Sequence, residues 1–310
     1  MAEFTRRNFL SATAGAAGCL ALSGSAFSGA VAAAEGALPP PPQVPLGKTG
    51  ITLSRVGQGT GMSGGNRQSN HTRMGFEKLV TLLKHSYDRG ITFFDMADLY
   101  GTHVYFREAL RTIPRDKVTL LTKLWFRYDK LDPKADAAAI KKVAAATLER
   151  FCHELNTDHI DIVLLHCVMV RNWPEELGPY MEALDQAKKQ GLIRAVGVSS
   201  HDLGGLETAA TCPWVDVVLA RINPRGARMD GKVEDVVPVL RKIRDNGKAI
   251  IGMKIYGEGS LAKNPQDREE CIKYAQTAGL VDAMTIGFEA PNQVDETLAL
   301  LAKYPQSPVV

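Results

Sequence analysis

The stretch Ile91-Thr-Phe-Phe-Asp95-Met-Ala-Asp-Leu-Tyr100-Gly101 decides the fold and places the chemistry of this chain. Its apolar first half is short and bounded by turn residues, which predicts a buried β-strand. That strand would carry Asp95 at its C-terminal end, and the following loop would bring Tyr100 over the same end. A carboxylate buried there needs a partner. The stretch therefore predicts polar groups from several strands gathered at one edge of a sheet.

Two later apolar runs offer those partners. Lys123 and His166 each end a run that predicts a further buried strand. Either residue alone is explained equally well as a satisfied structural polar group. Their coincidence with Asp95 and Tyr100, all at or just beyond strand ends, instead favours a functional site.

Predicted strands and helices alternate along the chain around this stretch. The strands are predicted at 54–58, 91–95, 118–123, 160–166, 193–199, 215–222, 248–254 and 282–287. The helices are predicted at 74–89, 103–112, 133–155, 174–190, 203–210, 232–246, 265–278 and 291–303. Several helices end in a glycine directly before a strand, which suits the left-handed geometry that terminates a helix; these are Gly90, Gly191, Gly247 and Gly279. The alternation is typical of an α/β protein of the (β/α)8 TIM-barrel class.

A β-hairpin is predicted ahead of the barrel at residues 44–54, with its turn at 47–50. An open doubly wound sheet is the alternative architecture. Such a sheet usually carries a G-x-G-x-x-G turn after its first strand, and residues 57–62 (Gly-Gln-Gly-Thr-Gly-Met) lack the last glycine. The barrel is therefore favoured. Because active sites of barrels lie at the C-terminal ends of the strands, this fold brings the four polar side chains to one mouth.

Composition bounds the classes of function. The 310-residue chain is 45% hydrophobic and 23% charged, which is ordinary for a globular protein. Its formal net charge of +3 is too small to argue for a nucleic-acid partner. The cysteines form neither a C-x-x-C pair nor a zinc spacing. We therefore expect no metal site, and we expect buried, unpaired thiols beyond the N-terminal segment.

Residues 1–34 predict a targeting signal. Thr5-Arg6-Arg7-Asn8-Phe9-Leu10 resembles the twin-arginine consensus, and Ala32-Ala33-Ala34 offers a cleavage site near Ala34. The run between them is too short and too weakly hydrophobic for a spanning helix. We expect the twin-arginine export machinery as a partner, a periplasmic or other extracytoplasmic location, and no stable membrane insertion after cleavage. An amphipathic or disordered N-terminus is the alternative, and lipid attachment at Cys19 stays open.

The segment after the predicted signal indicates a boundary between a linker and the barrel domain. Residues 35–45 contain a run of four prolines, 39–42, which indicates a stiff extended linker. Residues 46–310 then form the predicted barrel domain.

Asp95, Tyr100, Lys123 and His166 together resemble the tetrad of the aldo-keto reductases, and the resemblance covers roughly residues 46–303. It implies an NAD(P)-dependent oxidoreductase that interconverts a carbonyl (aldehyde, ketone or sugar) and an alcohol by hydride transfer, with Tyr100 as general acid/base. A free phenol has a pKa of about 10, so Lys123 is expected to lower that pKa while Asp95 holds Lys123 in place. His166 would donate a hydrogen bond to the substrate oxygen.

The resemblance also implies a cofactor site at the ends of the later strands. Its predicted residues are Ser199, Ser200, Asn223, Met253, Lys254, Gly287, Gln293 and Glu296. Two positions depart from the family pattern. Leu219 stands where a glutamine is common, and Met253 stands where a tyrosine stacks on the nicotinamide. A methionine packs on the ring without stacking as an aromatic side chain does.

The region after the last predicted strand leaves the choice between NADP and NAD open. NADP-specific relatives place cations around the adenosine 2′-phosphate, whereas residues 287–293 contain none and include Glu289. An inward Glu289 would repel the phosphate. We therefore expect weaker discrimination against NAD than the family norm.

Two functions from different classes follow from these residues. In the first, the chain is an exported oxidoreductase whose small-molecule carbonyl or alcohol substrate binds against Trp125 and Tyr128, although an ordinary surface loop explains those two residues equally well. In the second, it is a sensor or binding protein that retains the cofactor and turns over slowly, as aldo-keto reductase-like channel β subunits do. The intact tetrad favours the first function, and the changes at Leu219 and Met253 favour the second.

Overall fold

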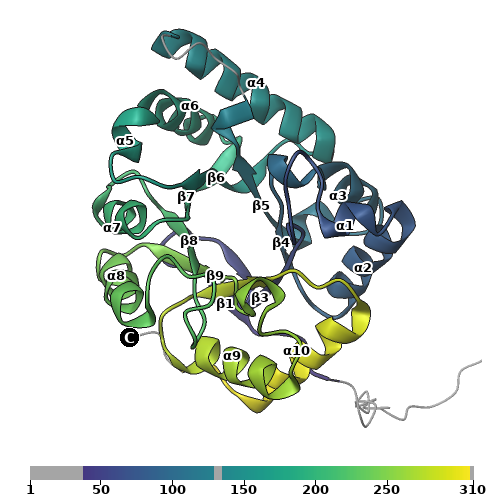
Figure 1. Ribbon diagram of the computed structural model, residues 1–310. Coiled ribbons are helices and arrows are strands. Elements are labelled where there is room, and N and C mark those ends of the chain that lie inside the picture. The colour runs from purple at the N-terminus through teal and green to yellow at the C-terminus, as the bar shows by residue number, and fades with distance from the viewer. Residues whose placement is uncertain (1–37, 129–134, 308–310) are drawn as a thin grey trace, which may run out of the picture. The chain divides into compact units, whose positions relative to one another are not determined.

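The computed structural model describes residues 38–128 and 135–307, and within them eight parallel strands close into a barrel (Figure 1). The strands are β3 (Val56–Gly59), β4 (Phe93–Asp95), β5 (Thr119–Leu124), β6 (Ile160–Val168), β7 (Ile193–Ser200), β8 (Val217–Arg221), β9 (Ala249–Met253) and β10 (Ala283–Ile286). The barrel closes where β10 pairs with β3, with Thr285 opposite Gly57. The predicted (β/α)8 barrel is confirmed.

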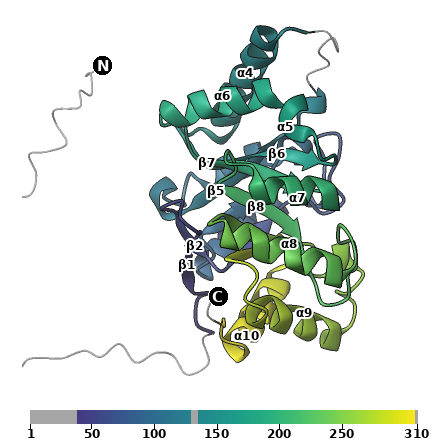
Figure 2. The same ribbon diagram turned by 90° about the vertical axis from the view of Figure 1, so that its left-hand side faces the viewer.

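Helices surround the barrel on its outside (Figures 1 and 2). They are α1 (Asn70–Arg73), α2 (Phe76–Asp88), α3 (His103–Ala109), α4 (Ala137–Leu155), α5 (Trp173–Glu176), α6 (Gly178–Lys189), α7 (Leu203–Thr211), α8 (Val233–Asp245), α9 (Pro265–Thr277) and α10 (Pro291–Lys303). Short 3-10 turns add η1 (Asp98–Tyr100), η2 (Arg115–Lys117), η3 (Phe126–Tyr128) and η4 (Gly257–Gly259). The part of the chain that the structure describes contains no helix with the length and apolarity to cross a bilayer.

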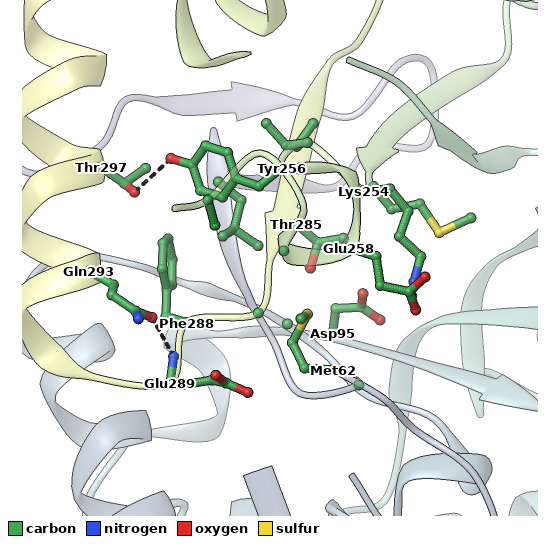
Figure 3. Close-up of a pocket in the computed structure, with 18 of the residues that line it drawn as sticks. Met62, Asp95, Lys254, Tyr256, Glu258, Thr285, Phe288, Glu289, Gln293 and Thr297 are labelled. Carbon is green, nitrogen blue, oxygen red and sulfur yellow. Dashed lines mark hydrogen bonds and ion pairs between the residues drawn. The ribbon is translucent and has the colours of Figure 1, made fainter. Parts of the chain in front are cut away.

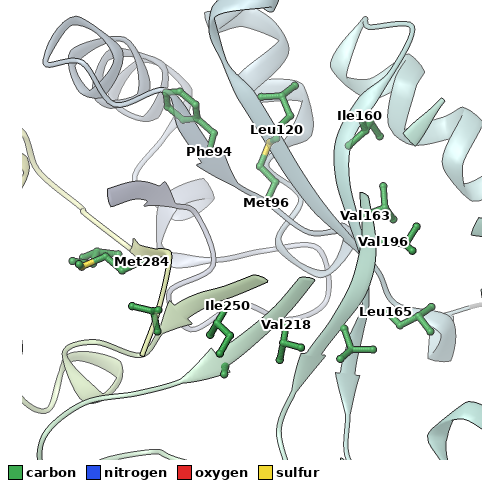
Figure 4. Close-up of a cluster of buried hydrophobic side chains, with 14 of the residues drawn as sticks. Phe94, Met96, Leu120, Ile160, Val163, Leu165, Val196, Val218, Ile250 and Met284 are labelled. Atoms are coloured by element: carbon green, nitrogen blue, oxygen red, sulfur yellow. The ribbon is translucent and has the colours of Figure 1, made fainter. Parts of the chain in front are cut away.

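Alternation along each strand separates two hydrophobic cores. Phe94, Leu120 and Val163 belong to the larger cluster, which packs between the sheet and the helices (Figure 4). Their neighbours Phe93 and Leu121 belong to a second cluster that fills the barrel interior. Because side chains of a strand alternate between its faces, the residue two positions after an interior side chain also points inward. This rule places the polar strand ends inside the mouth of the barrel.

The predicted hairpin is confirmed, and it closes the N-terminal end of the barrel. Strands β1 (Gln43–Pro45) and β2 (Thr52–Ser54) pair antiparallel. Apolar side chains of the hairpin join the interior cluster, among them Leu46 and Ile51. The ordered packing also begins earlier than the predicted boundary at residue 46. The carbonyl oxygen of Pro42 accepts a hydrogen bond from the Arg55 amide at 2.8 Å, since a proline lacks only the donor of its peptide group.

One predicted helix is wrong as a single element. The segment 174–190 forms two helices, α5 and α6, which meet at Leu177, whose φ is −108° and ψ is 12°. Pro179 stands in the first turn of α6, where a proline is tolerated, but it would interrupt a continuous helix.

Other boundaries lie within a few residues of their predictions. The proposed start of α4 at Asp132-Pro133 lies outside the described residues, and the described helix instead begins after Asp136, whose side chain accepts a hydrogen bond from the Ala139 amide at 2.7 Å. The predicted helix-ending glycines have positive φ, for example 87° at Gly90 and 78° at Gly191. The predicted targeting signal, residues 1–34, also lies outside the described residues. Within them, the cysteines are unpaired as predicted.

Candidate active site

The four predicted catalytic side chains meet at the C-terminal mouth of the barrel. Asp95 ends β4, Lys123 lies near the end of β5, His166 lies in β6, and Tyr100 lies in the turn η1. Lys123 is fully buried and forms an ion pair with Asp95. Its Nζ also donates a hydrogen bond to the carbonyl oxygen of Met96 at 2.9 Å. The ammonium is thus held in place from two sides.

Tyr100 lies between this ion pair and His166. Its hydroxyl is 3.4 Å from His166 Nε2, and the two rings meet edge to face with centroids 5.6 Å apart. The Lys123 ammonium lies 4.9 Å from the centroid of the Tyr100 ring. These side chains therefore lie together in the structure, as the sequence predicts.

The protonation of Tyr100 differs from the sequence-based expectation. Burial raises the pKa of Tyr100 well above its usual value, and the negative charge of Asp95 adds to the rise. Burial therefore outweighs the lowering of this pKa that was predicted for Lys123. Burial also holds the pKa of His166 well below its usual value, with the charge of Lys123 adding to this effect. Around neutral pH, the pair consists of a protonated phenol and a neutral imidazole.

The Tyr100 ring is held by the loop after β3. A Cβ atom built on Gly61 would lie 2.3 Å from the Tyr100 ring, and one on Gly64 would lie 2.6 Å from it. The same loop is tied to η1 by Arg67, whose Nε donates to Asp98 at 3.0 Å. Arg150 of α4 donates to the same carboxylate at 2.9 Å and 3.1 Å. The contacts of Arg67 and Arg150 with Asp98 were not predicted from the sequence, although Asp98 stands only two residues before Tyr100.

Substituting Gly61 with alanine should lower kcat for carbonyl reduction by roughly 10²-fold, because the added methyl must displace the phenol ring from its position. Gly65→Ala is the matched control, since nothing lies within 4 Å of a Cβ at that position. Steady-state kinetics of the two variants measure the difference. Equal activity in both variants would show that the ring position does not matter.

A cavity of about 450 Å³ opens beside Tyr100 and Asp95. It lies between the ends of β3, β9 and β10, the loop 254–262 and the start of α10, so that Asp95 and Gln293 lie on different sides of it (Figure 3). Five of the predicted cofactor residues line this cavity, and they are Met253, Lys254, Gly287, Gln293 and Glu296.

The other three predicted cofactor residues do not line this cavity. The Ser199 hydroxyl accepts a hydrogen bond from the Cys167 amide at 3.0 Å, and the Ser200 hydroxyl donates to the Asp202 carbonyl at 2.9 Å. Asn223 donates to the carbonyl of Ala227 at 2.7 Å and thereby shapes the loop after β8. Their polar groups are engaged with neighbouring backbone.

The predicted substrate-pocket residues lie against the imidazole. The Trp125 ring meets the His166 ring at a centroid distance of 5.6 Å, and Tyr128 meets Trp125 at 6.4 Å. Arg67 lies 4.9 Å over the Tyr128 ring. This aromatic wall flanks the His166 imidazole.

The cavity suits a nicotinamide dinucleotide by its shape and its lining. Glycines form a close cradle, since a Cβ on Gly287 would lie 2.5 Å from Met62 and one on Gly59 would lie 2.9 Å from the Thr285 hydroxyl. That hydroxyl is buried, lines the cavity and has no hydrogen-bond partner among the described residues. The amide nitrogen of Gln293 stays available, because its oxygen accepts from the Glu289 amide at 2.7 Å. The described residues contain no group of side chains able to hold a metal ion.

The cavity contains a cation that was not predicted from the sequence. Arg268 of α9 lines the cavity and donates to the Glu296 carboxylate at 2.7 Å and 2.9 Å. Arg268 lies outside residues 287–293, so the absence of cations from that segment does not leave this cavity without a positive charge. Arg268 comes from the helix after β9 instead of the segment after β10, so only the folded packing of α9 against α10 shows it. Glu289 lines the same cavity and opposes the positive charge.

A closed barrel with a buried Lys–Asp pair, a phenol and an imidazole at its mouth is the arrangement that the resemblance to the aldo-keto reductases implies. The chain matches the Aldo/keto reductase family over residues 55–305, and it belongs to that family. It is 27% identical over 224 residues to the NADH-specific methylglyoxal reductase of Escherichia coli (strain K12), covering 66% of this chain and 64% of that enzyme. It is 30% identical over 172 residues to the aldo-keto reductase YhdN of Bacillus subtilis (strain 168), covering 53% of this chain and 48% of that one.

A solved structure supports the fold. The holo form of an aldo-keto reductase from Bacillus halodurans has a TM-score of 0.63 and 18% identity, covering 86% of this chain and 92% of that one. The chain spans about half to two thirds of the length of the two curated relatives.

Proposed function

We propose that this chain is an exported, NAD(P)-dependent oxidoreductase that interconverts a carbonyl and an alcohol, with Tyr100 as general acid/base. One observation carries the proposal. The Tyr100 hydroxyl and His166 Nε2 lie 3.4 Å apart, beside a buried ion pair and at the edge of a cavity of about 450 Å³. A carbonyl oxygen placed between the phenol and the imidazole would contact both.

The nicotinamide would supply the hydride, and the chain supplies the rest of the chemistry. Tyr100 donates its proton to the carbonyl oxygen as negative charge develops there, and it takes the proton back from an alcohol in the reverse direction. His166, which is neutral, hydrogen-bonds the same oxygen and orients the substrate. The raised pKa of Tyr100 keeps its phenol protonated, as a proton donor must be. The Lys123 ammonium over the ring favours the charge that appears on the phenol during proton transfer.

The test is cofactor oxidation in the presence of small aldehydes. A relative in Escherichia coli is named an NADH-specific methylglyoxal reductase, so methylglyoxal is a suitable first substrate. We expect reduced cofactor bound to the protein to be oxidised, once aldehyde is added, at a rate in the ordinary enzyme range of about 1–10³ s⁻¹. A protein that binds reduced cofactor but fails to oxidise it with any aldehyde would favour the alternative function, a sensor that retains its cofactor. Leu219 and Met253, which line the cavity, are the residues that favour this alternative.

Cofactor preference should be weak. Arg268 is already paired with Glu296, and Glu289 shares the cavity, so a 2′-phosphate gains little from the arginine. We expect the dissociation constants of NADP and NAD to differ by less than about a hundredfold, roughly 2.7 kcal/mol. Glu296→Gln should release Arg268 and shift the preference toward NADP by about tenfold. Glu269→Gln is the control on α9, because Glu269 pairs with Lys303 instead. Calorimetric titration of the three proteins with each cofactor measures the six constants, and an unchanged preference in Glu296→Gln would contradict the assignment.

Export would also require the protein to release its cofactor slowly. The twin-arginine route carries proteins that fold before crossing the membrane, and free nicotinamide cofactor is expected in the cytoplasm and not outside it. An exported enzyme that released its cofactor in every cycle would soon be empty. The proposed solution is a cofactor that dissociates slowly and is recycled by paired substrates, one reduced and the other oxidised.

Gel filtration of the protein after expression should therefore yield about one bound nucleotide per chain, because a low koff dominates tight binding. Mass spectrometry identifies the nucleotide. Turnover with an aldehyde and an alcohol together should proceed with no cofactor added. A protein that emerges empty and works only with free cofactor would contradict the carried-cofactor proposal.

A further inference from the structure

The inward face of the barrel mouth carries an arginine that the proposed catalytic chemistry does not use. Val217 and Leu219 of β8 belong to the interior cluster, so alternation directs Arg221 at the end of that strand into the mouth. Arg221 pairs in register with Met253 on β9, and Met253 lines the cofactor cavity. The guanidinium therefore belongs to the layer of side chains that surrounds the reacting groups.

Arg221 is connected to the catalytic imidazole through a second histidine. Arg221 Nη2 donates to His201 Nδ1 at 2.5 Å, which leaves the proton of the neutral ring on Nε2. His201 Nε2 then donates to the Cys167 sulfur at 3.5 Å. The His201 ring lies edge to face with the His166 ring, with centroids 6.4 Å apart. Arg221 thus lies one ring away from the expected carbonyl position.

The hydrogen-bonding capacity of Arg221 is incompletely used. Its Nη1 lies 3.2 Å from Asp230, but its buried Nε has no partner among the described residues. Arg55, a structural arginine at the base of the barrel, offers a contrast. Each of its Nε, Nη1 and Nη2 atoms donates to a protein oxygen at 2.6–2.7 Å. Arg55 is thus saturated, whereas Arg221 keeps unused donors and is 19% exposed; Arg244 of α8 also has a buried Nε without a partner among the described residues.

Positive charge is concentrated around this position. The Cys167 thiol is within electrostatic range of four cations, which are Lys123, Arg127, Lys254 and Arg221. Three of them face an acid, since Lys123 pairs with Asp95, Lys254 with Glu258 and Arg221 with Asp230. Arg127 has no carboxylate partner in residues 38–128 and 135–307; it lies over the Trp125 ring at 5.4 Å. Arg127 is thus the one of these four cations that lacks a carboxylate partner among the described residues.

We infer that the substrate of this chain carries a carboxylate, which Arg221 binds while the carbonyl lies between Tyr100 and His166. Nη1 and Nη2 each carry a second N–H beside the one directed at Asp230 or His201, and the exposed edge of the guanidinium provides the donors. Planar guanidinium groups match carboxylate geometry. The aromatic wall at Trp125 flanks the segment that joins the two groups. This inference rests on the proposed carbonyl chemistry and adds the substrate class to it.

The test compares two aldehydes that differ only in charge, 4-carboxybenzaldehyde and its neutral isostere 4-formylbenzamide. In the unsubstituted protein, kcat/KM should be at least about tenfold higher for the carboxylate. The variant is Arg221→Gln with Asp230→Asn, because Arg221→Gln alone would leave Asp230 buried and unpaired. The double change leaves the net charge of the mouth unaltered, so a lost preference reports the guanidinium itself. We expect the ratio of the two kcat/KM values to fall at least about tenfold, chiefly through KM.

The matched control is Arg89→Gln with Asp295→Asn, which removes a 2.7 Å ion pair between α2 and α10 away from the mouth. Its substrate ratio should equal that of the unsubstituted protein. A ratio near one in the unsubstituted protein, or an unchanged ratio in the Arg221 variant, would overturn the inference.

A binding measurement separates this inference from the proposed function. If neither aldehyde is reduced, the carbonyl chemistry is wrong, and titration with 4-(hydroxymethyl)benzoate and 4-(hydroxymethyl)benzamide tests the carboxylate site alone. Preferential binding of the benzoate, lost in the Arg221 variant, supports the site. Equal binding of the two compounds, or a preference that survives in the variant, overturns it.

Discussion

Tyr100→Phe is expected to lower kcat for carbonyl reduction by roughly 10²–10⁴-fold, because the substitution removes only the proton that the carbonyl oxygen receives. The ring should keep its position, since Gly61 and Gly64 contact its carbon atoms and not its hydroxyl. The dissociation constant of the cofactor should therefore change little. Steady-state kinetics and calorimetric titration on the same preparation measure the two quantities.

Tyr105→Phe is the matched control for this prediction. Tyr105 lies in α3 and packs against Phe76 with ring centroids 5.3 Å apart, so its hydroxyl has no part in the proposed chemistry. We expect nearly unchanged kinetics. A Tyr100→Phe variant with near-normal kcat would remove Tyr100 from the mechanism.

Lys123→Met should affect both stability and turnover. Lys123 is fully buried beside Asp95, and its removal leaves a carboxylate without its counter-ion in the barrel interior. Breaking a buried pair in this way typically costs about 3–5 kcal/mol. The free energy of unfolding, measured by urea denaturation, should fall by that amount, and kcat should fall with it because the ammonium over the Tyr100 ring is lost.

The double variant Asp95→Asn with Lys123→Met separates the two effects. Replacing both charges removes the unpaired carboxylate, so most of the lost stability should return. Turnover should stay low, because no ammonium faces the phenol. Recovery of both stability and kcat would show that the ion pair is only structural.

Much of this fold was predictable because its signals are local. Glycines such as Gly90 end helices next to apolar runs, and their spacing alone indicates alternating helices and strands. Once the barrel is assumed, residues at strand ends must share one mouth, which is why Asp95, Lys123 and His166 could be grouped before any geometry was known. The break between α5 and α6 was missed, although Pro179 was a local signal for it.

The remaining features depend on contacts between distant segments. Arg268 meets Glu296 only because α9 and α10 pack together, and no spacing in the sequence relates them. Arg221 and His201 lie at the ends of neighbouring strands but lack a recognisable motif. The protonation of Tyr100 follows from desolvation in the folded chain and from the nearby charge of Asp95, and the sequence alone shows neither.

The most direct test of the central claim is a single turnover with reduced cofactor that carries deuterium at both positions of C4 of the nicotinamide. The protein, loaded with this cofactor, is mixed with an excess of aldehyde, and mass spectrometry measures deuterium in the alcohol. We predict one deuterium at the carbinol carbon for each cofactor oxidised, in the unsubstituted protein and, far more slowly, in Tyr100→Phe. An alcohol without deuterium, or bound cofactor that stays reduced in the presence of every aldehyde, would contradict the assignment of this barrel as a hydride-transferring oxidoreductase.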